Sequence, residues 1–391
     1  MKVLYCGDAA VSSGFARCTH AVCDALTEAG HEVHVLGINY YGDPHTYPYP
    51  IYTCQNPLDM GRDAFGVTRL PGLIYRLRPD VVVLQNDPWN IPVYLQEMKS
   101  QLPEDFQMPP VVGFVAVDAK NQKASGLNGL AHVAVWTEFA KRELMAGGYK
   151  GETTVIPLGV SPKFHPIDKR LARRAAMPHG LPESAFVIGV VGRNQIRKRL
   201  DLSIEYFAKW IKSQDIKDAY LYLHIGPTGD VGADIRSLVF YHGVQTRVIL
   251  AEPRLGTGID EQAMACMYSS LNLYFSTSQG EGWGLPALEA MACGTPCLVP
   301  KWSGLESWAS PAAAMIECDG TALTAPMNGL AYTLGGIPSR EETLRWLTNL
   351  YDNRSNLEML SESGLQLART LPWSLTGETF VKMLEEKFGG S

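Results

Sequence analysis

The chain has 391 residues, of which 46% are apolar and 19% are charged, and its formal net charge is −6. This length is greater than the chain length that one hydrophobic core ordinarily serves, which predicts two domains. The negative net charge disfavours nucleic acid or an anionic membrane as a general partner. No apolar run reaches the roughly 18–20 residues of a membrane span, and the first eight residues are typical of a strand and not of a signal peptide. We therefore expect a cytoplasmic protein whose eight cysteines, none in a C-x-x-C pair, are reduced and mostly buried.

The first half of the chain alternates short apolar runs with amphipathic helical stretches. The predicted strands are 3–7, 33–38, 81–85, 111–117, 132–136 and 153–157. The predicted helices are 14–29, 66–78, 92–101 and 138–147. This alternation is typical of a parallel sheet that helices cover on both faces.

The proline-rich stretch 157–168 predicts a linker, and after a helix at 168–177 the alternation starts again. The later predicted strands are 186–192, 220–226, 247–251, 272–276 and 296–300. The later predicted helices are 200–213, 232–242, 260–270, 286–293 and an all-helical region from 339 onward that ends with a helix at 374–388. The sequence thus predicts an α/β protein with two Rossmann-like, doubly wound domains. Because ligands of such sheets bind beyond the carboxyl ends of the strands, we expect two sheet edges facing across a cleft to form one shared site.

A glycine-rich loop between a predicted strand and a predicted helix is the densest motif of the chain. Residues 278–289 read SQGEGWGLPALE. Pro286 suits a first helical position because it has no N–H to leave unpaired, which would place Glu289 in the first helical turn. Glycines let the backbone come close to a ligand, and helix N-termini favour anions. Together with Glu281 and Glu289, the loop predicts a ligand that offers both hydroxyls and phosphate.

Basic residues follow another predicted strand, in the stretch GRNQIRKR at 192–199. Arg193 is suited to bidentate contact with phosphate oxygens, and Lys198 to a point-charge contact. Taken alone the stretch is equally well explained as a solvated surface. Because this basic stretch is predicted to lie in the same domain as Glu281 and Glu289, the two motifs together indicate a phosphate site.

Three strand ends of the first half carry further candidates. The turn after the first strand leads into a helix near Gly14, which suits either a close approach of phosphate or simply a tight turn. Asp118 follows a strongly apolar strand, and we favour a functional role for it over helix capping. Asp87, before Pro88, is equally well explained as a turn residue. Trp89 and the tyrosine-rich segment 40–52 suit stacking on sugars or bases, and equally well suit core packing.

Several motifs of other nucleotide-binding proteins are absent. The chain has no G-x-x-x-x-G-K-[ST] motif, and no G-x-G-x-x-G lies between a strand and a helix, which disfavours a P-loop and NAD binding. No D-x-D occurs, so a carboxylate-held metal for a nucleoside diphosphate has no evident site.

The second half resembles glycosyltransferase family 4, whose members are retaining enzymes with the GT-B fold. The resemblance rests on the E-x7-E spacing of Glu281 and Glu289, the Arg193/Lys198 pair, the segment VIPLGV at 155–160 and the segment ALEAMACGTP at 287–296. It implies a donor-binding domain at 161–373 and an acceptor-side domain at 1–160, which the C-terminal helix, 374–391, crosses back to join.

The resemblance also implies roles for individual residues. Arg193 and Lys198 would neutralise the donor diphosphate in place of a metal, Glu281 would bind sugar hydroxyls, and Glu289 would bind the ribose. The remaining donor contacts that it implies are the backbone of Gly282, Trp283, Gly284 and Leu285, Gly14 near the phosphate, and Arg254 near the base. Many relatives carry a histidine where this chain has Asp118, so Asp118 is expected to stabilise the reacting sugar or to accept a proton.

We therefore expect a hexosyl- or pentosyltransferase without metal or other cofactor that uses a UDP-, GDP- or ADP-linked sugar and retains the anomeric configuration. The acceptor stays open between a glycan, a small molecule, a protein, a lipid-linked glycan and modified DNA, and Asp87, Trp89 and Asp118 are the acceptor-side candidates. Two alternatives remain: a nucleotide-sugar epimerase, which needs no acceptor, and a nucleotide-sugar-binding scaffold without activity. The oligomeric state is not predicted.

Overall fold

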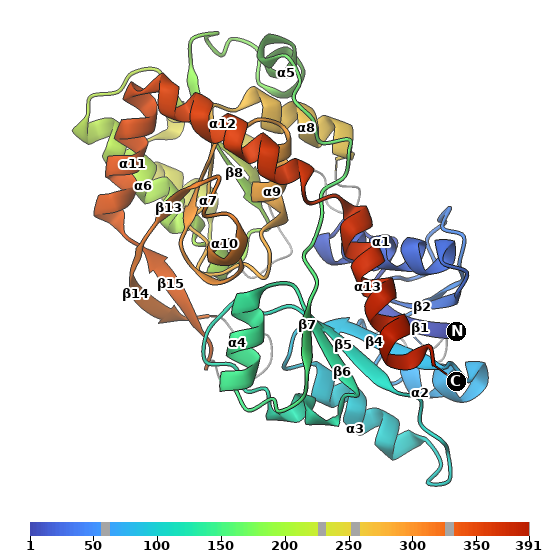
Figure 1. The fold of residues 1–391 in the computed structure, drawn as a ribbon. Helices are drawn as coiled ribbons and strands as arrows, with labels where there is room; N and C mark the ends of the chain where they lie inside the picture. The colour runs from blue at the N-terminus through green and yellow to red at the C-terminus, as the bar shows by residue number, and fades with distance from the viewer. Residues whose placement is uncertain (56–62, 226–231, 252–258, 325–331, 391) are drawn as a thin grey trace. The chain divides into compact units, whose positions relative to one another are not determined.

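The computed structural model describes residues 1–55, 63–225, 232–251, 259–324 and 332–390. Contacts divide the chain into two compact units. Unit 1 comprises Met1–Val117, Asn121–Leu158 and Trp373–Ser391, and unit 2 comprises Asp118–Lys120 and Gly159–Pro372. Each unit is built around its own parallel sheet (Figure 1).

The sheet of unit 1 has seven parallel strands in the order β3-β2-β1-β4-β5-β6-β7. Its strands are β1 (Lys2–Asp8), β2 (Glu32–Ile38), β3 (Ile51–Thr53), β4 (Val81–Asn86), β5 (Val111–Val115), β6 (His132–Val135) and β7 (Thr153–Val155). The order runs outward in both directions from β1, which is the doubly wound arrangement. β4 is buried along its whole length because helices cover both faces.

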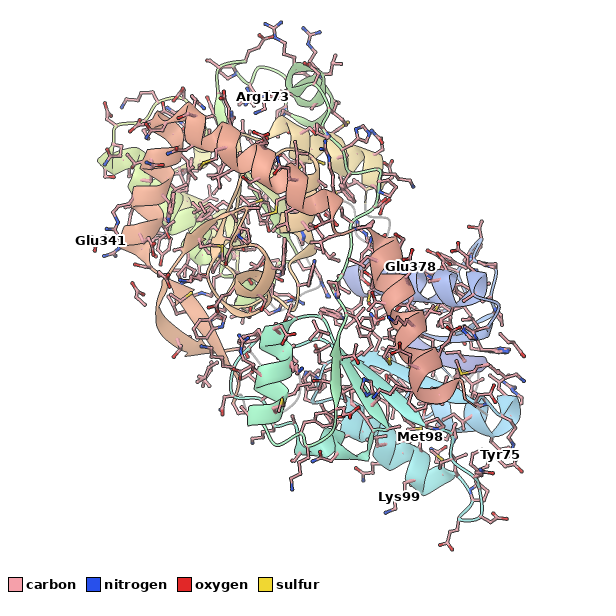
Figure 2. The ribbon with its side chains drawn as sticks, in the orientation of Figure 1. Tyr75, Met98, Lys99, Arg173, Glu341 and Glu378 are labelled. Atoms are coloured by element: carbon pink, nitrogen blue, oxygen red, sulfur yellow. The ribbon has the colours of Figure 1, made fainter. Side chains whose placement is uncertain are left out.

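Helices pack on both faces of this sheet. They are α1 (Gly14–Glu28), α2 (Leu70–Leu77), α3 (Ile91–Gln101), the 3-10 turn η1 (Ser125–Gly129), α4 (Glu138–Ala146) and α13 (Trp373–Phe388). Leu4 of β1 joins a core with α2, α3 and α4, whereas the ring of Tyr5 lies 6.3 Å from that of Phe380 in α13. On α3, Met98 is buried while the adjacent Lys99 points outward (Figure 2).

The C-terminal helix α13 lies beside α1, although the two are at opposite ends of the chain (Figure 1). Gly377 allows this approach, because a Cβ there would lie 2.5 Å from the Cβ of Ala25. The hydroxyl of Thr376 donates to the carbonyl of Pro157 at 2.7 Å, which joins α13 to the segment that follows β7.

The main sheet of unit 2 has six parallel strands in the order β10-β9-β8-β11-β12-β13. Its strands are β8 (Phe186–Gly192), β9 (Ala219–Ile225), β10 (Val248–Ala251), β11 (Leu273–Phe275), β12 (Cys297–Pro300) and β13 (Ala314–Ile316). A two-stranded antiparallel hairpin follows, formed by β14 (Cys318–Leu323) and β15 (Leu334–Pro338).

Helices also cover both faces of this second sheet. They are α5 (Lys169–Ala176), η2 (Ile196–Lys198), α6 (Leu200–Ser213), α7 (Ile235–Tyr241), η3 (Gln245–Arg247), α8 (Glu261–Ser270), α9 (Leu285–Ala292), α10 (Ser303–Trp308), α11 (Arg340–Asp352) and α12 (Arg354–Arg369). The core on one face includes Phe207 and Trp210 of α6. On α5, Arg173 is not a solvated surface cation: its guanidinium donates to the carbonyl of Ala185 and the side chain of Asn272, each at 2.7 Å (Figure 2).

The predicted fold class is confirmed, and the predicted strands and helices are present with small shifts at their ends. The predictions at 186–192 and 200–213 coincide with β8 and α6. The sequence analysis missed β3, α10, β13, β14 and β15, which are short and lack a clear apolar period. The eight cysteines are free thiols, and all are buried except Cys266 and Cys318, which are half-buried. No helix within the described ranges has the length and apolar character that a membrane crossing requires.

Candidate active site

The candidate site lies where the strand order of unit 2 reverses. β8 is followed by η2 and α6 and continues outward through β9, whereas its other neighbour, β11, leads outward through β12. In a doubly wound sheet the loops after two such strands diverge and leave a crevice at the carboxyl edge, where ligands bind. The two motifs predicted to bind the donor are the loops that follow β8 and β11.

The loop after β8 is held in place through Asn194 and Arg199. The buried side chain of Asn194 accepts from the amide of Ala233 at 3.0 Å and donates to its carbonyl at 2.8 Å. Arg199 has a left-handed backbone (φ 48°), and its guanidinium pairs with Asp201 at 2.8 Å. Arg193 is exposed at this edge, and the turn η2 between these anchors carries Arg197 and Lys198.

The loop after β11 is clamped by Ser303 at the start of α10. The amide of Glu281 donates to the Ser303 hydroxyl at 2.9 Å, and that hydroxyl donates to the Glu281 carbonyl at 3.1 Å. The amide of Gly304 donates to the same carbonyl at 2.9 Å. The backbone of Glu281 therefore has a defined position before any ligand arrives.

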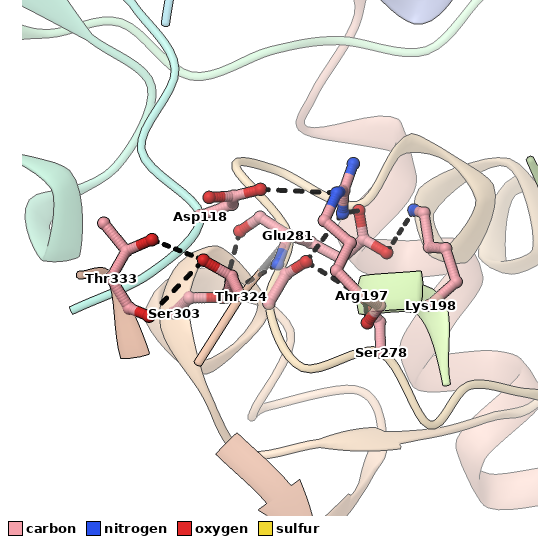
Figure 3. A network of polar contacts seen from close by, with 9 residues as sticks. Asp118, Arg197, Lys198, Ser278, Glu281, Ser303, Thr324 and Thr333 are labelled. Carbon is pink, nitrogen blue, oxygen red and sulfur yellow. Dashed lines mark hydrogen bonds and ion pairs between the residues drawn. The ribbon is translucent and has the colours of Figure 1, made fainter. Parts of the chain in front are cut away.

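The two loops meet in a ladder of four alternating charges (Figure 3). Lys198 Nζ lies 2.5 Å from Glu281 Oε1, and Arg197 lies 3.4 Å from Glu281 Oε2 and, through Nε, 3.4 Å from Asp118 Oδ2. The side chains of Lys198 and Glu281 are only 14% and 12% exposed, so water screens their attraction weakly. Sequence reasoning singled out three of the four residues and missed Arg197, whose place beside Lys198 was the only available signal.

The pKa values of the buried pair follow from this arrangement. Burial alone raises the pKa of the Glu281 carboxyl, but the nearby cations of Lys198 and Arg197 outweigh burial and hold it below the ordinary value. Burial lowers the pKa of the Lys198 ammonium, although Glu281 opposes the shift. Glu281 is thus held as an ionised carboxylate, which accepts hydrogen bonds.

Asp118 belongs to unit 2 by its contacts, although the sequence analysis assigned it to the first domain. Two residues further on, Lys120 exchanges two backbone hydrogen bonds with Leu334 at the start of β15, of 2.9 and 3.0 Å. The Lys120 ammonium also lies 4.1 Å from the ring centroid of Trp302. By these contacts residues 118–120 belong to unit 2, although the residues on either side of them in the chain belong to unit 1.

Two glycines of the loop after β11 are required by packing within the protein. A Cβ on Gly280 would lie 1.8 Å from the carbonyl oxygen of Asp118. Gly284 has φ +92°, and a Cβ there would lie 2.6 Å from Leu305. Protein atoms therefore already account for glycine at these two positions, and the approach of a ligand to this loop stays a prediction.

The Trp283 side chain is buried and stacks on Trp308, with ring centroids 5.1 Å apart. The Trp308 indole N–H donates to the Trp283 carbonyl at 2.8 Å. Trp283 therefore anchors the loop through its side chain, and only its backbone N–H remains a candidate for ligand contact. Helix α9 begins two residues after Trp283, at Leu285.

Glu289 is the fifth residue of α9, so it lies in the second turn and not in the first, because the helix begins at Leu285 rather than at Pro286. It is 4% exposed, and the hydroxyl of Tyr268 in α8 donates to its Oε2 at 2.8 Å. This hydrogen bond orients a buried carboxylate at the carboxyl edge of the sheet.

A cavity of about 550 Å³ lies at the carboxyl ends of β9 and β10. Met267, the neighbour of Tyr268, is one of its lining residues. The others are Ala175, Ala176, Tyr222, His224, Ala251, Ile259, Asp260, Gln262, Ala263 and Cys266. Arg254, predicted to lie near the base, falls outside the described residues.

The remaining candidates belong to the carboxyl edge of unit 1. Gly14 is the first residue of α1, whose N-cap Ser13 accepts from the amide of Ala16 at 3.0 Å and bonds Asp8 at 2.7 Å. Asp87 and Trp89 are half-buried and follow β4, the strand beside β1. They flank the point where the strand order of unit 1 reverses, and their roles stay predictions.

No cluster of three or more His, Cys, Asp or Glu side chains suited to a metal ion occurs in the ranges that the structure covers.

The fold and the loops define a class: two Rossmann-like units of the GT-B type, with a charged site at the switch point of the second. Comparisons with known proteins support the same class. Residues 173–316 match the family described as "Glycosyl transferases group 1". Sucrose-phosphate synthase from Thermosynechococcus elongatus has a TM-score of 0.76 at 17% identity, with 100% of both chains covered. Anabaena HepE in complex with UDP and glucose has a TM-score of 0.71 at 14% identity, covering 99% of this chain and 100% of that one.

Curated relatives point to the same class. A D-inositol 3-phosphate glycosyltransferase of Stackebrandtia nassauensis is 34% identical over 176 residues, which cover 42% of this chain and 38% of the relative. One from Kribbella flavida is 26% identical over 324 residues, which cover 78% of this chain and 68% of the relative. The matches thus span between about two fifths and two thirds of these relatives. The chain has the GT-B fold and resembles glycosyltransferase family 4, as the sequence analysis expected.

Proposed function

We propose that the protein is a glycosyltransferase that moves a sugar from a nucleotide-diphosphate sugar to an acceptor hydroxyl. The observation that carries the proposal is the meeting of Lys198 and Glu281 at the switch point of unit 2. A cation for phosphate and a carboxylate for hydroxyls, adjacent in one site, match the two ends of such a donor.

In the proposed mechanism, the bond between the anomeric carbon and the diphosphate oxygen breaks. The electron pair leaves with the diphosphate, where Arg193 and Lys198 stabilise the added negative charge without a metal or other cofactor. Glu281 holds the sugar hydroxyls, and the backbone amides of Gly282, Gly284 and Leu285 lie along the donor. The acceptor oxygen bonds to the anomeric carbon from the face that the diphosphate leaves, so the configuration is retained.

The nucleoside would bind beside Glu289. Its carboxylate, which the Tyr268 hydroxyl orients, is suited to the two ribose hydroxyls. The cavity of about 550 Å³, which is lined in part by α8, the helix of Tyr268, is large enough for a base. The uridine, guanosine and adenosine diphosphates are all candidates, with hexose or pentose sugars. We favour a uridine nucleotide, because the structure of HepE, which has the same fold, was solved with UDP-glucose.

For the acceptor, we propose a polyol phosphate, because the curated relatives are named for D-inositol 3-phosphate. Gly14, Asp87 and Trp89 of unit 1 are the proposed contacts, together with Asp118. The acceptor proton would pass to the Asp118 carboxylate or to a leaving-group oxygen. An epimerase would need no acceptor, so incubation of the donor alone, with analysis for an isomeric sugar nucleotide, separates that alternative.

A donor screen tests the proposal. Thermal-shift and hydrolysis measurements with UDP-, GDP- and ADP-sugars should single out one nucleotide. Polyol phosphates, glycans and DNA with modified bases are then tested as acceptors with the selected donor. We expect Asp118→Ala to lose transfer but to keep nucleotide affinity. No stabilisation by any nucleotide sugar would contradict the proposed function, and a near-normal transfer rate would remove Asp118 from the mechanism.

A further inference from the structure

Arg197 connects three parts of unit 2 through one guanidinium group. It donates to the carbonyl of Gly280 at 2.8 Å and lies 3.4 Å from the carboxylates of both Glu281 and Asp118 (Figure 3). Only 30% of its side chain is exposed. The planar guanidinium with its five N–H donors can reach several oxygen atoms at fixed angles, which a lysine ammonium cannot do.

The backbone of Arg197 is tied to the same loop. Its carbonyl accepts from the amide of Gln279 at 2.7 Å and from the hydroxyl of Ser278 at 3.4 Å. Backbone and side chain together therefore join η2 to residues 278–281. A side chain anchored at both ends of its length cannot turn toward a ligand without breaking several of these contacts.

Lys198 differs from Arg197 in this respect. The ion pair of its ammonium group is with Glu281, and a donor diphosphate would compete for that ammonium with two or more negative charges. If Lys198 turned toward the diphosphate, Arg197 would still lie 3.4 Å from the Glu281 carboxylate. A buried carboxylate that keeps a nearby cation can stay ionised and in place for the sugar hydroxyls.

We propose that Arg197 is a positioning residue that holds Glu281 and Asp118 in place while Lys198 binds the donor diphosphate. This role rests on the proposed function. Neither the E-x7-E spacing nor the Arg193/Lys198 pair assigns it, since it follows from contacts between three segments that are distant in the chain.

The test compares Arg197→Ala, Arg197→Lys and the control Lys209→Ala, which removes a cation paired with Glu205 on the exposed side of α6. Titration calorimetry gives the affinity for the nucleoside diphosphate selected by the donor screen, and steady-state kinetics gives kcat and KM. Arg197→Ala should change the nucleotide Kd by less than about threefold and lower kcat about 100-fold, the usual cost of a small misplacement of reacting groups. Arg197→Lys should recover less than a tenth of kcat, and Lys209→Ala should match the wild type.

Three outcomes would overturn the role. An unchanged kcat in Arg197→Ala would show that Glu281 and Asp118 need no such support. An equal loss of nucleotide affinity and of kcat would make Arg197 a phosphate ligand instead. If Arg197→Ala does not fold, the same comparison is made on Arg197→Lys and Arg197→Gln, and full activity of either would contradict the role. If the wild-type chain binds no nucleotide, the proposed function itself is wrong. That outcome is seen in the wild type alone, so it is distinct from the three outcomes that concern the Arg197 variants.

Discussion

The ammonium nitrogen of Lys198 lies 2.5 Å from the carboxylate of Glu281, and both side chains are largely buried. The two residues come from loops after different strands, so the ion pair joins β8 to β11 at the carboxyl edge of their sheet. In the absence of a donor, each group is the counter-ion of the other. This relationship predicts effects on stability as well as on activity.

Replacement of Lys198 by methionine is expected to destabilise the fold. Removing one partner of a buried ion pair usually costs about 3–5 kcal/mol, and we expect roughly 2 kcal/mol here because Arg197 stays close to Glu281. Urea unfolding at pH 7 measures the loss. Lys209→Met, on an exposed helix face, should change the free energy of unfolding by less than about 0.5 kcal/mol. Equal stability of Lys198→Met and the wild type would contradict the prediction, and adding Glu281→Gln should restore part of the loss.

The stability contributed by Glu281 should disappear in acid. Because its folded-state pKa is below the unfolded value of about 4.3, the stabilisation is complete above that value and is lost as the pH falls through the lower, folded-state pKa. Unfolding free energies from pH 6 to pH 3 should therefore fall more steeply for the wild type than for Glu281→Gln. Parallel curves for the two proteins would show that Glu281 has no depressed pKa.

A second pH effect is expected from His20 in unit 1. The amide of Ala10 donates to His20 Nε2 at 3.0 Å, so Nδ1 carries the proton and donates to the Tyr49 hydroxyl at 2.8 Å. Burial lowers the pKa of His20 to about 4. Between about pH 6.5 and pH 4, His20 is therefore protonated in the unfolded chain but neutral in the folded chain. Stability should fall by roughly 2–3 kcal/mol between pH 6.5 and pH 4. Denaturant titrations of His20→Gln should lack this slope, and a slope that persists would assign the effect to another group.

Gly280→Ala should disturb the site through its backbone neighbour. The added Cβ would overlap the carbonyl oxygen of Asp118 at 1.8 Å, so Asp118 or the loop must move. We expect a loss of about 2 kcal/mol, typical of overpacking, together with loss of transfer. Gly72→Ala is the matched control, because nothing lies within 4 Å of its Cβ and alanine favours its helix. If both variants are equally stable, the contact between Gly280 and Asp118 is not a tight one.

Tyr268→Phe should weaken nucleotide binding specifically. The substitution removes the hydrogen bond to Glu289 while keeping the aromatic ring, so stability should fall by only about 1 kcal/mol. If Glu289 holds the ribose, nucleotide affinity should fall about tenfold, since the carboxylate loses the hydrogen bond from Tyr268 that orients it. Calorimetry with the ribo- and 2′-deoxynucleotide checks this, because the wild type should discriminate between them and the variant should do so less. Unchanged discrimination would remove Tyr268 from the ribose site.

The sequence by itself determined the alternation of strands and helices, including β8 and α6, and the two strand-to-helix segments that carry Arg193, Lys198, Glu281 and Glu289. These features are local: apolar periodicity, strand ends and the spacing of charged residues are properties of neighbouring positions. Only the tertiary structure decided that Lys198 pairs with Glu281, that Asp118 joins unit 2 through Arg197, and that Gly280 is needed for Asp118. Such contacts depend on which strands become neighbours and on how segments far apart in the chain dock, and no local pattern of residues encodes that pairing.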